Sequence, residues 1–476
     1  MITMTTTFPH PIQTLDKKHW YLLEKLAFLN HGSFGACPKV IIQQQRAIQQ
    51  ELETSPVAFY LRTLTAQWIH TKQHLASLIH AQADHLLLVP NASEGVSTVL
   101  HNITWQAGDE IVVSNHAYPA CRHMLSVLSQ RKGIVVKIAY TTFAHFDVHT
   151  NAEHSYIGYH QIVEAYEAQI TERTRCLFIE HISSPTALCF PVEALIHLAK
   201  RHNILSIVDA AHAIGQVHID LQSWQPDFYI SNTHKWLLTP KSCAFLYVAP
   251  QHHAHFYPLV VSHGYIKASE IWPMNVHDTH AHQDIHSDPT KRIYQGTQAL
   301  FEWTGTRDYS AYLCIPHTVE WIEKYCGSVD QMIQSNHLKL IQARTMILHA
   351  WWGDQIDSLQ LPPVDFLASM CTIPVPPIRT LDQEGIKVGV LDHIHPLQEY
   401  LYQHDIEIPV IKWQGGVQAS LPHESHSHPA STPSLSDPHL NAHTHNQRLC
   451  IRISAQLYNT VEDYQRLIQC IEDLRV

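Results

Sequence analysis

The chain has 476 residues, 45% of them hydrophobic and 9% aromatic, and a formal net charge of −11 from 31 Lys and Arg against 42 Asp and Glu. These values predict a globular protein with two or more subdomains, and the negative balance counts against a nucleic-acid binder, which needs a basic face. The ten Cys are scattered without a CxxC pair, the N-terminus lacks a signal-peptide pattern, and no run of about 18 apolar residues occurs. We therefore expect a cytoplasmic protein with reduced thiols and neither a nucleic-acid nor a membrane partner.

Histidine is the unusual residue of this sequence. Forty are present, and many cluster in "HDTHAHQDIH" (277–286) and in the Ser/Pro-rich tract 423–445. Such tracts can hold a metal, but their spacing is irregular and no Cys or carboxylate set completes a tetrahedral site. We predict insertions at about 266–293 and 421–446 and no metal site.

The elements of the first two thirds alternate between helix and strand. An N-terminal arm (1–27) precedes residues 40–80, whose apolar positions have helical spacing. Seven short apolar runs then alternate with helical patterns, at 85–90, 109–115, 133–140, 175–183, 204–213, 227–236 and 243–250. Strands buried on both faces and separated by helices are typical of a parallel sheet. We predict an α/β fold, with a mostly parallel seven-stranded sheet covered by helices on both faces, in a large domain over 28–320.

The pattern changes in the last third. A long helical region at about 310–350 is followed by the strand-like "SMCTIPVP", a helix near 394–405, "IEIPVI", "QRLCIRIS" and a final helix from about 461. Mixed elements of this kind predict a smaller α+β domain over 321–476.

Three polar features lie where predicted strands end, which is where ligands gather in an open α/β sheet. "NASEGVSTVL" is a strand-to-helix turn whose free N–H groups suit a phosphate, Asp209 ends an apolar strand, and Lys235 follows another. Each alone has an ordinary explanation: a capped helix, a capping aspartate, or a partly exposed lysine. Together they fit a pyridoxal phosphate (PLP) site, which needs a Schiff-base lysine, an acid for the ring nitrogen and a helix N-terminus for the phosphate. No GxGxxG follows a strand and no GxxxxGK[ST] loop occurs, so nicotinamide and nucleoside triphosphate sites are not indicated.

Eight motifs occur in the order seen in class V aminotransferase-like enzymes of PLP fold type I. They are "FLNHGSFGACP", "NASEGVSTVL", "SNHAYPA", "HISSPTALCFPV", "VDAAHAIGQ", "SNTHKW", "FEWTGTRD" and "RISAQLYNTVEDY". The chain resembles this family from about residue 28 to 470, outside the His-rich insertions, and most of all its isopenicillin N epimerase-like branch.

The resemblance implies a role for each matching residue around the cofactor. Lys235 would form the Schiff base, Asp209 would pair with the pyridine nitrogen, and His212 would contact the ring hydroxyl. Tyr118 is the preferred candidate for stacking on the ring, with His116 as the alternative. The remaining cofactor contacts implied are Ser93, Glu94 and Gly95 in the phosphate turn, Asn232 and His234 beside it, and Ser184 near the ring oxygen.

Further residues are implied at the substrate and at a subunit boundary. Arg452 matches the arginine that grips a substrate carboxylate, and Asn30 and His31 would line the substrate entrance. Gly305 and Thr306 match a segment that reaches the neighbouring subunit's phosphate, which implies a homodimer with shared active sites. Ordinary explanations stay open for Arg452 (a structural ion pair), His116 (a turn histidine) and Thr306 (a turn residue).

The expected reaction begins with removal of the α-proton of a small amino-acid substrate by the Lys235 amine. Our leading interpretation is a PLP enzyme acting at the α-carbon of an amino acid or amino-acid conjugate, like the epimerase or an aminotransferase. The alternative enzyme is a C–S lyase acting on a cysteine conjugate and releasing pyruvate. Persulfide transfer is disfavoured, since "IEIPVIKWQGGVQAS" has no Cys and Cys450 lies in an apolar run. A distant alternative is a non-catalytic, His-rich metal-binding protein on a PLP scaffold.

Overall fold

A computed structural model describes most of the chain: residues 12–141, 158–262, 297–359, 361–379, 381, 386–388, 391–414 and 447–476. The two predicted His-rich insertions lie outside the described residues. None of the helices in these ranges is long and apolar enough to cross a bilayer.

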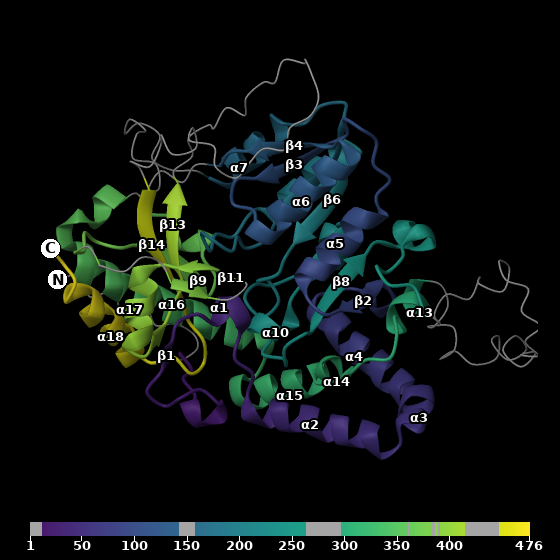
Figure 1. Ribbon diagram of the computed structural model, residues 1–476, viewed down its shortest axis with the longest axis horizontal. Helices are drawn as coiled ribbons and strands as arrows, with labels where there is room; N and C mark the ends of the chain where they lie inside the picture. Colours follow the sequence, from purple (N-terminus) through teal and green to yellow (C-terminus); the bar gives the residue numbers. More distant parts are fainter. Residues whose placement is uncertain are drawn as a thin grey trace, which may run out of the picture.

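The larger part of the molecule is built on a seven-stranded sheet (Figure 1). Its strands are β2 (Leu86–Val89), β3 (Glu110–Ser114), β4 (Val135–Ala139), β5 (Thr174–Glu180), β6 (Leu205–Asp209), β7 (Phe228–Ser231) and β8 (Ala244–Val248), in the order β2-β8-β7-β6-β5-β3-β4. All neighbours from β4 to β7 pair in parallel, while β8 is antiparallel to both β7 and β2. The predicted mostly parallel seven-stranded sheet is confirmed.

Helices cover both faces of this sheet, as the apolar runs predict. On β5, Cys176 and Phe178 belong to one hydrophobic cluster, while Leu177 and Ile179 belong to the other. Successive side chains of a strand point to opposite faces, so a strand buried on both sides needs apolar residues throughout. The first face carries α5 (Ala92–Asn102) and α6 (Pro119–Lys132), and the second carries α7 (Tyr159–Glu167) and α8 (Val192–Arg201).

The C-terminal part is a smaller α+β unit, as predicted from the change of pattern. Its central sheet has the order β13-β14-β9 and packs against two long helices (Figure 1). The elements of this unit are α16 (Val329–Trp352), β9 (Met370–Pro374), α17 (Pro396–Gln403), β13 (Val410–Gln414), β14 (Gln447–Ser454) and α18 (Val461–Glu472). The preceding helices α13 (Thr297–Glu302), α14 (Ser310–Leu313) and α15 (Ile315–Cys326) pack on the larger part. A small hairpin, β10 (Ile386–Val388) and β11 (Leu391–Ile394), was not expected from the sequence.

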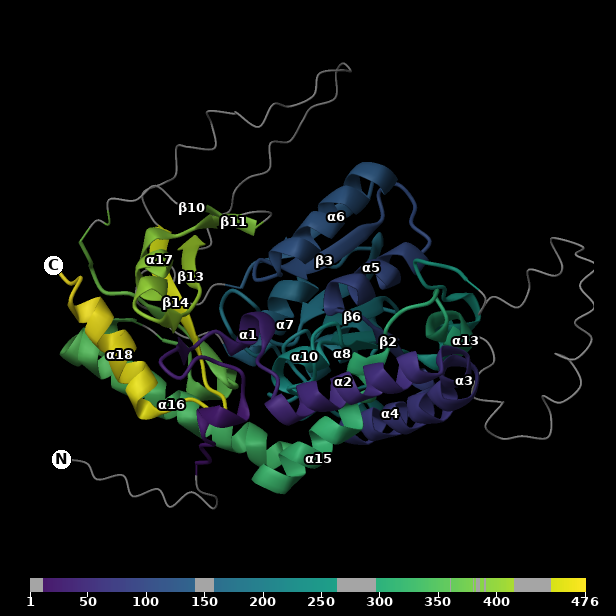
Figure 2. The ribbon, with the colours of Figure 1, turned by 60° about the horizontal axis from the view of Figure 1, so that its bottom comes forward.

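The N-terminal segment connects the two parts. β1 (Ala27–Phe28) pairs in parallel with β12 (Ile406–Glu407), and α1 (His31–Phe34) follows between the two sheets (Figures 1 and 2). The chain then forms α2 (Lys39–Thr54), α3 (Pro56–Ala58) and α4 (Leu64–Leu78) along the large part. Shorter helices are α9 (Leu221–Trp224), α10 (Thr233–Trp236), 3-10 turns at Lys17–His19, Ala83–His85, Pro250–His255, Gly353–Leu359 and Val364–Phe366, and a π turn at Phe59–Thr63.

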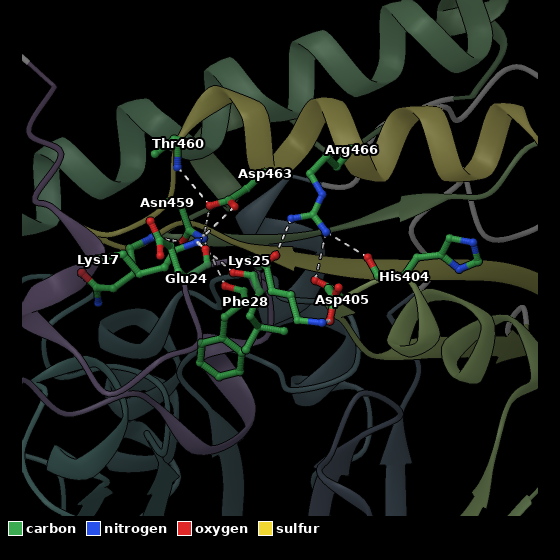
Figure 3. Close-up of polar contacts among 12 residues, drawn as sticks. Lys17, Glu24, Lys25, Phe28, His404, Asp405, Asn459, Thr460, Asp463 and Arg466 are labelled. Atoms are coloured by element: carbon green, nitrogen blue, oxygen red, sulfur yellow. Dashed lines mark hydrogen bonds and ion pairs between the residues drawn. The ribbon is translucent and has the colours of Figure 1, made fainter.

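Polar contacts hold this N-terminal segment to α18 (Figure 3). Arg466 donates from Nη1 to the carbonyl of Lys25 at 2.6 Å and from Nη2 to the carbonyl of His404 at 2.9 Å. Asp463 lies 3.5 Å from the Lys17 ammonium. The arm is therefore anchored on the smaller unit, and α1 enters the interior from a fixed starting point.

Candidate active site

Polar side chains converge at the carboxyl edge of the seven-stranded sheet. Glu180 ends β5 and Asp209 ends β6, and the two are register partners. β7 ends at Ser231 and leads into α10, which carries Lys235. Because these strands are parallel, all three groups lie at one edge of the sheet, where the sequence pattern places Asp209 and Lys235.

Lys235 is a buried lysine whose surroundings favour the neutral amine. Its Nζ lies 3.3 Å from Nε2 of His212, and the indole N–H of Trp236 donates to Nδ1 of the same imidazole at 3.4 Å. An indole can only donate, so neutral His212 carries its proton on Nε2 and presents it to the lysine lone pair. Burial, and then the Arg452 cation, lower the pKa of Lys235 to about 8. The predicted Schiff-base residue is thus a nucleophilic amine near neutral pH.

Asp209 is held by two donors at the end of β6. The amide of Ala211 donates to Oδ1 at 3.0 Å, and the thiol of Cys121 donates to Oδ2 at 3.3 Å. Burial raises the pKa of the carboxyl, while Lys235 counteracts this rise. Asp209 forms no salt bridge with any described residue, so a cationic ring nitrogen would complete its surroundings.

Glu180 and Cys121 are site neighbours that sequence reasoning missed. Glu180 accepts from the Ser114 hydroxyl at 2.6 Å, and its other oxygen has no hydrogen-bond partner among the described residues. Burial, with a contribution from Asp209, raises its pKa to about 8, so it is mostly protonated at neutral pH. Its position at the end of "RCLFIE" beside an Asp-terminated strand was the available signal.

The N-terminus of α5 forms the predicted phosphate end of the site. Asn91 caps the helix by accepting from the Glu94 amide at 2.9 Å, and the Asn232 side-chain oxygen accepts from the Ala92 amide at 2.8 Å. The Ser93 amide between them has no partner among the described residues, so one backbone donor is left for an anion. Asn232 thus positions this helix end as well as lying beside it.

Two other residues of the predicted phosphate set have contacts within the protein. A Cβ on Gly95 would meet Cγ2 of Ile230 at 2.7 Å, so this glycine allows α5 to pack closely on β7. His234 bonds through Nδ1 to the carbonyl of Cys243 at 2.7 Å, and burial lowers its pKa to about 4. The carbonyl can only accept, so Nδ1 of neutral His234 carries the proton and Nε2 is an acceptor. This does not favour the predicted role of His234 as a phosphate donor.

Arg452 on β14 is a buried cation that lacks an acidic partner. Its Nη1 donates to the backbone and the hydroxyl of Ser184, and its Nη2 donates to the Ser33 hydroxyl at 3.1 Å and to Asn30 Oδ1 at 3.5 Å. No carboxylate of the described residues forms a salt bridge with it, and burial lowers its pKa to about 10. The structural ion pair that was the alternative explanation is not found in the described part. An incoming carboxylate would satisfy this guanidinium.

The two candidates for stacking on the ring are placed differently. His116 is fully buried, with Nε2 at 2.9 Å from the Thr141 carbonyl and Nδ1 at 2.8 Å from the Thr186 hydroxyl, so its orientation is locked. Tyr118 is 41% exposed, and its phenol feels both the Asp209 charge, which raises its pKa, and the Arg452 charge, which lowers it. Tyr118 therefore lies within electrostatic range of both Asp209 and Arg452, and its stacking on the ring stays a prediction.

Of three further predicted contacts, the structure does not favour one, and the other two stay predictions. Ser184 holds Arg452 through both its carbonyl and its hydroxyl, so its position near the ring oxygen stays a prediction. His31 is fully buried with both ring nitrogens bonded to protein atoms, which does not favour a place in the substrate entrance. Gly305, with φ of +125°, and Thr306 follow α13, and a Cβ added to Gly305 would meet no atom of the described residues within 4 Å.

The whole arrangement fits PLP. A buried lysine with a lowered pKa, a buried carboxylate without a salt-bridge partner in the described residues and a helix N-terminus with a spare donor match the cofactor's aldehyde, ring nitrogen and phosphate in turn. A buried guanidinium without a carboxylate completes the set on the substrate side. In the described ranges, no group of three or more His, Cys, Asp or Glu is arranged to hold a metal ion.

Comparisons with known proteins agree with this fit. The chain is 27% identical over 459 residues to a probable chloroplastic L-cysteine desulfhydrase of Arabidopsis thaliana, covering 94% of this chain and 82% of that protein. It is 28% identical over 293 residues to isopenicillin N epimerase of Streptomyces clavuligerus, covering 62% of this chain and 68% of that one. The solved structure of the cystine C–S lyase C-DES with its product cysteine persulfide superposes with a TM-score of 0.66 at 16% identity, over 95% of this chain and 98% of that one. That likeness shows the fold. The family model for class-V aminotransferases matches residues 38–349, so the chain belongs to the class-V aminotransferase family of PLP-dependent enzymes.

Proposed function

We propose that this protein is a PLP-dependent lyase that cleaves the Cβ–S bond of cysteine or an S-substituted cysteine. The observation that carries the proposal is the buried Arg452 cation, which has no acidic partner in the described residues and lies close enough to Lys235 to lower its pKa. A guanidinium in that position selects an α-carboxylate and places the adjacent α-carbon near the amine. The proposal makes the C–S lyase, our alternative from the sequence, the leading activity.

The side chains of the site divide the chemical work. Bound PLP supplies an electron sink that stabilises negative charge on the α-carbon. The Asp209 carboxylate keeps the ring nitrogen protonated, Arg452 orients the substrate, and the Lys235 amine takes the α-proton. The Cβ–S bond then breaks with its electron pair on sulfur, which leaves as a thiolate. One water converts the remaining three-carbon unit to pyruvate and ammonium.

The thiols of the chain support free release of the sulfur atom. All ten cysteines lie in the described residues; nine are buried, and only Cys470, on α18, is partly exposed. The Cys121 thiol, which lies in the site, donates a hydrogen bond to Asp209, and burial raises its pKa well above the usual range. A buried protonated thiol is a poor nucleophile, so none of the nine buried cysteines is suited to accept sulfur as a persulfide. The relatives named as cysteine desulfhydrases match almost the whole chain, which favours the lyase over the epimerase.

Incubation with L-cysteine, S-methylcysteine and alanine in deuterated water tests the proposal. The expected result is pyruvate together with sulfide or methanethiol from the two cysteines, and only solvent exchange at the α-carbon of alanine. Inversion at the α-carbon without pyruvate would favour epimerisation instead, and accumulation of the amine form of the cofactor would favour transamination. A purified protein that is colourless and rich in metal would support the non-catalytic alternative.

We also propose that the protein is a homodimer with shared sites. The support is the family pattern in which the segment of Gly305 and Thr306 reaches the neighbouring subunit's phosphate, together with the space beside Gly305 in the described part of the chain. Light scattering gives the mass directly. Mixing Lys235→Ala and Thr306→Ala protomers should regenerate part of the activity if sites are shared, and no recovery would contradict sharing.

A further inference from the structure

The short helix α1 contacts both the carboxylate clamp and the Schiff-base lysine. On one side its N-cap Asn30 and its Ser33 accept from Nη2 of Arg452. On the other side His31 bonds to the backbone carbonyl of Lys235 at 2.9 Å. A single helical turn therefore touches two groups that are 217 positions apart in the sequence, since 452 minus 235 is 217.

The tautomer of His31 follows from its partners. The carbonyl of Lys235 lies 2.9 Å from Nε2 of His31 and can only accept, so Nε2 carries the proton and donates to it. The Gln456 amide nitrogen, at 3.3 Å from the same atom, is the more distant neighbour. Nδ1 then accepts, and the hydroxyl of Tyr458 donates to it at 2.7 Å. Burial lowers the pKa of His31 to about 3, which keeps the ring neutral and this arrangement fixed. Both nitrogens are used within the protein, leaving none for a substrate.

Close packing prevents α1 from moving independently of its neighbours. The His31 amide donates to the Ser454 hydroxyl at 2.9 Å, two positions after Arg452 on the same strand. Gly35, which ends α1 with φ of +69°, lies against α10 so closely that a Cβ would stand 2.5 Å from the carbonyl of His234 and 2.9 Å from that of Lys235. Any movement of α1 would therefore also require movement of β14 and α10.

We propose that His31 is a positioning residue that links occupancy of Arg452 to the placement of Lys235. A carboxylate that binds the guanidinium competes with the uncharged acceptors Asn30 and Ser33. Loss of their hydrogen bonds to Arg452 changes the contacts that hold α1 in place. His31 transmits that change to the backbone of Lys235, whose side chain must face the α-carbon. The proposal rests on the proposed amino-acid activity but not on the C–S bond being the one cleaved.

Two substitutions of His31 distinguish the role of Nε2 from that of Nδ1. Glutamine places an amide near the Nε2 position and keeps the donor to Lys235, while asparagine reaches only the Nδ1 position and loses it. Tyr458→Phe removes the hydrogen bond that holds the His31 ring in place and serves as a second test of the link. The PLP-loaded enzymes are titrated with propionate, an unreactive carboxylate, while the visible absorption band of the Lys235–cofactor bond is recorded. kcat and KM for L-cysteine and the melting curve of each apoenzyme are measured in parallel.

The expected pattern is specific to positioning. Propionate should shift the band of the unaltered enzyme and of His31→Gln but not that of His31→Asn, with propionate binding within about twofold in all three. kcat of His31→Asn should fall about tenfold with little change in KM, as for a lost hydrogen bond to a buried carbonyl, and His31→Gln should recover most of it. An unresponsive band in the unaltered enzyme would overturn the coupling.

Other outcomes are equally decisive. A raised KM with unchanged kcat in both variants would make His31 a substrate ligand, as the sequence suggested, and equal loss in both would make it a packing residue. If His31→Asn does not fold, a lost band response in Tyr458→Phe supports the link, and a normal response contradicts it. A normal propionate response without pyruvate from cysteine would refute the proposed lyase activity while leaving the role of His31 intact.

Discussion

The depressed pKa of Lys235 makes a quantitative prediction about its reactivity in the apoenzyme. An amine must be neutral to attack a carbonyl, so its reactivity rises with pH through its pKa and then levels off. With a pKa of about 8 rather than the ordinary 10.5, about a quarter of Lys235 is neutral at pH 7.5, against about one in a thousand for an ordinary lysine. The gain in reactive amine is therefore roughly two hundredfold.

Peptide-level reductive methylation of the apoenzyme measures this directly. Formaldehyde has no titrating group of its own, so the pH dependence of labelling reports the amine alone. Labelling of the Lys235 peptide is normalised to Lys18, whose side chain is 73% exposed. The midpoint for Lys235 should lie near pH 8.

Two variants test whether neighbouring charges set the pKa of Lys235, and they should shift it in opposite directions. Arg452 lowers and Asp209 raises the pKa of Lys235, so Arg452→Met should move the midpoint upward and Asp209→Asn should move it downward. Arg452→Lys keeps the charge and should leave the midpoint near 8. A midpoint close to 10.5 in the unaltered protein, or shifts in the same direction for both variants, would refute the reasoning.

Three further predictions concern the cofactor, the substrate and the packing of α5. Asp209→Ala should weaken PLP binding and suppress α-proton exchange, measured by cofactor titration and by NMR in deuterated water; unchanged exchange would contradict the electron-sink role. Arg452→Met should raise KM for cysteine by about a hundredfold or more, as for a buried charge pair, but leave the already low reactivity of a cysteine ester unchanged. Gly95→Ala should cost about 1–3 kcal/mol in denaturant unfolding, because overpacking against Ile230 outweighs the helix-propensity gain of about 1 kcal/mol; Ile230→Leu, which removes the branched methyl, should restore part of it.

The sequence by itself determined the fold and singled out Asp209 and Lys235 as the predicted chemical core of the site. Apolar runs such as "CLFI" in β5 alternate between two hydrophobic clusters because strand periodicity is a local property of the chain. Asp209 and Lys235 could be recognised because a charged residue at the end of a buried strand needs a reason, and parallel strands deliver their ends to one edge.

Only the tertiary structure decided which side chains support that core. The thiol of Cys121 meets Asp209 across 88 positions, and His31 meets Lys235 across 204. Such contacts depend on how α6 and α1 dock, and no local pattern records that. The same limit explains why His31 was assigned to the substrate entrance: the motif located the residue near the site, but the direction of its ring is set by Tyr458 and the Lys235 carbonyl, which come from distant parts of the chain.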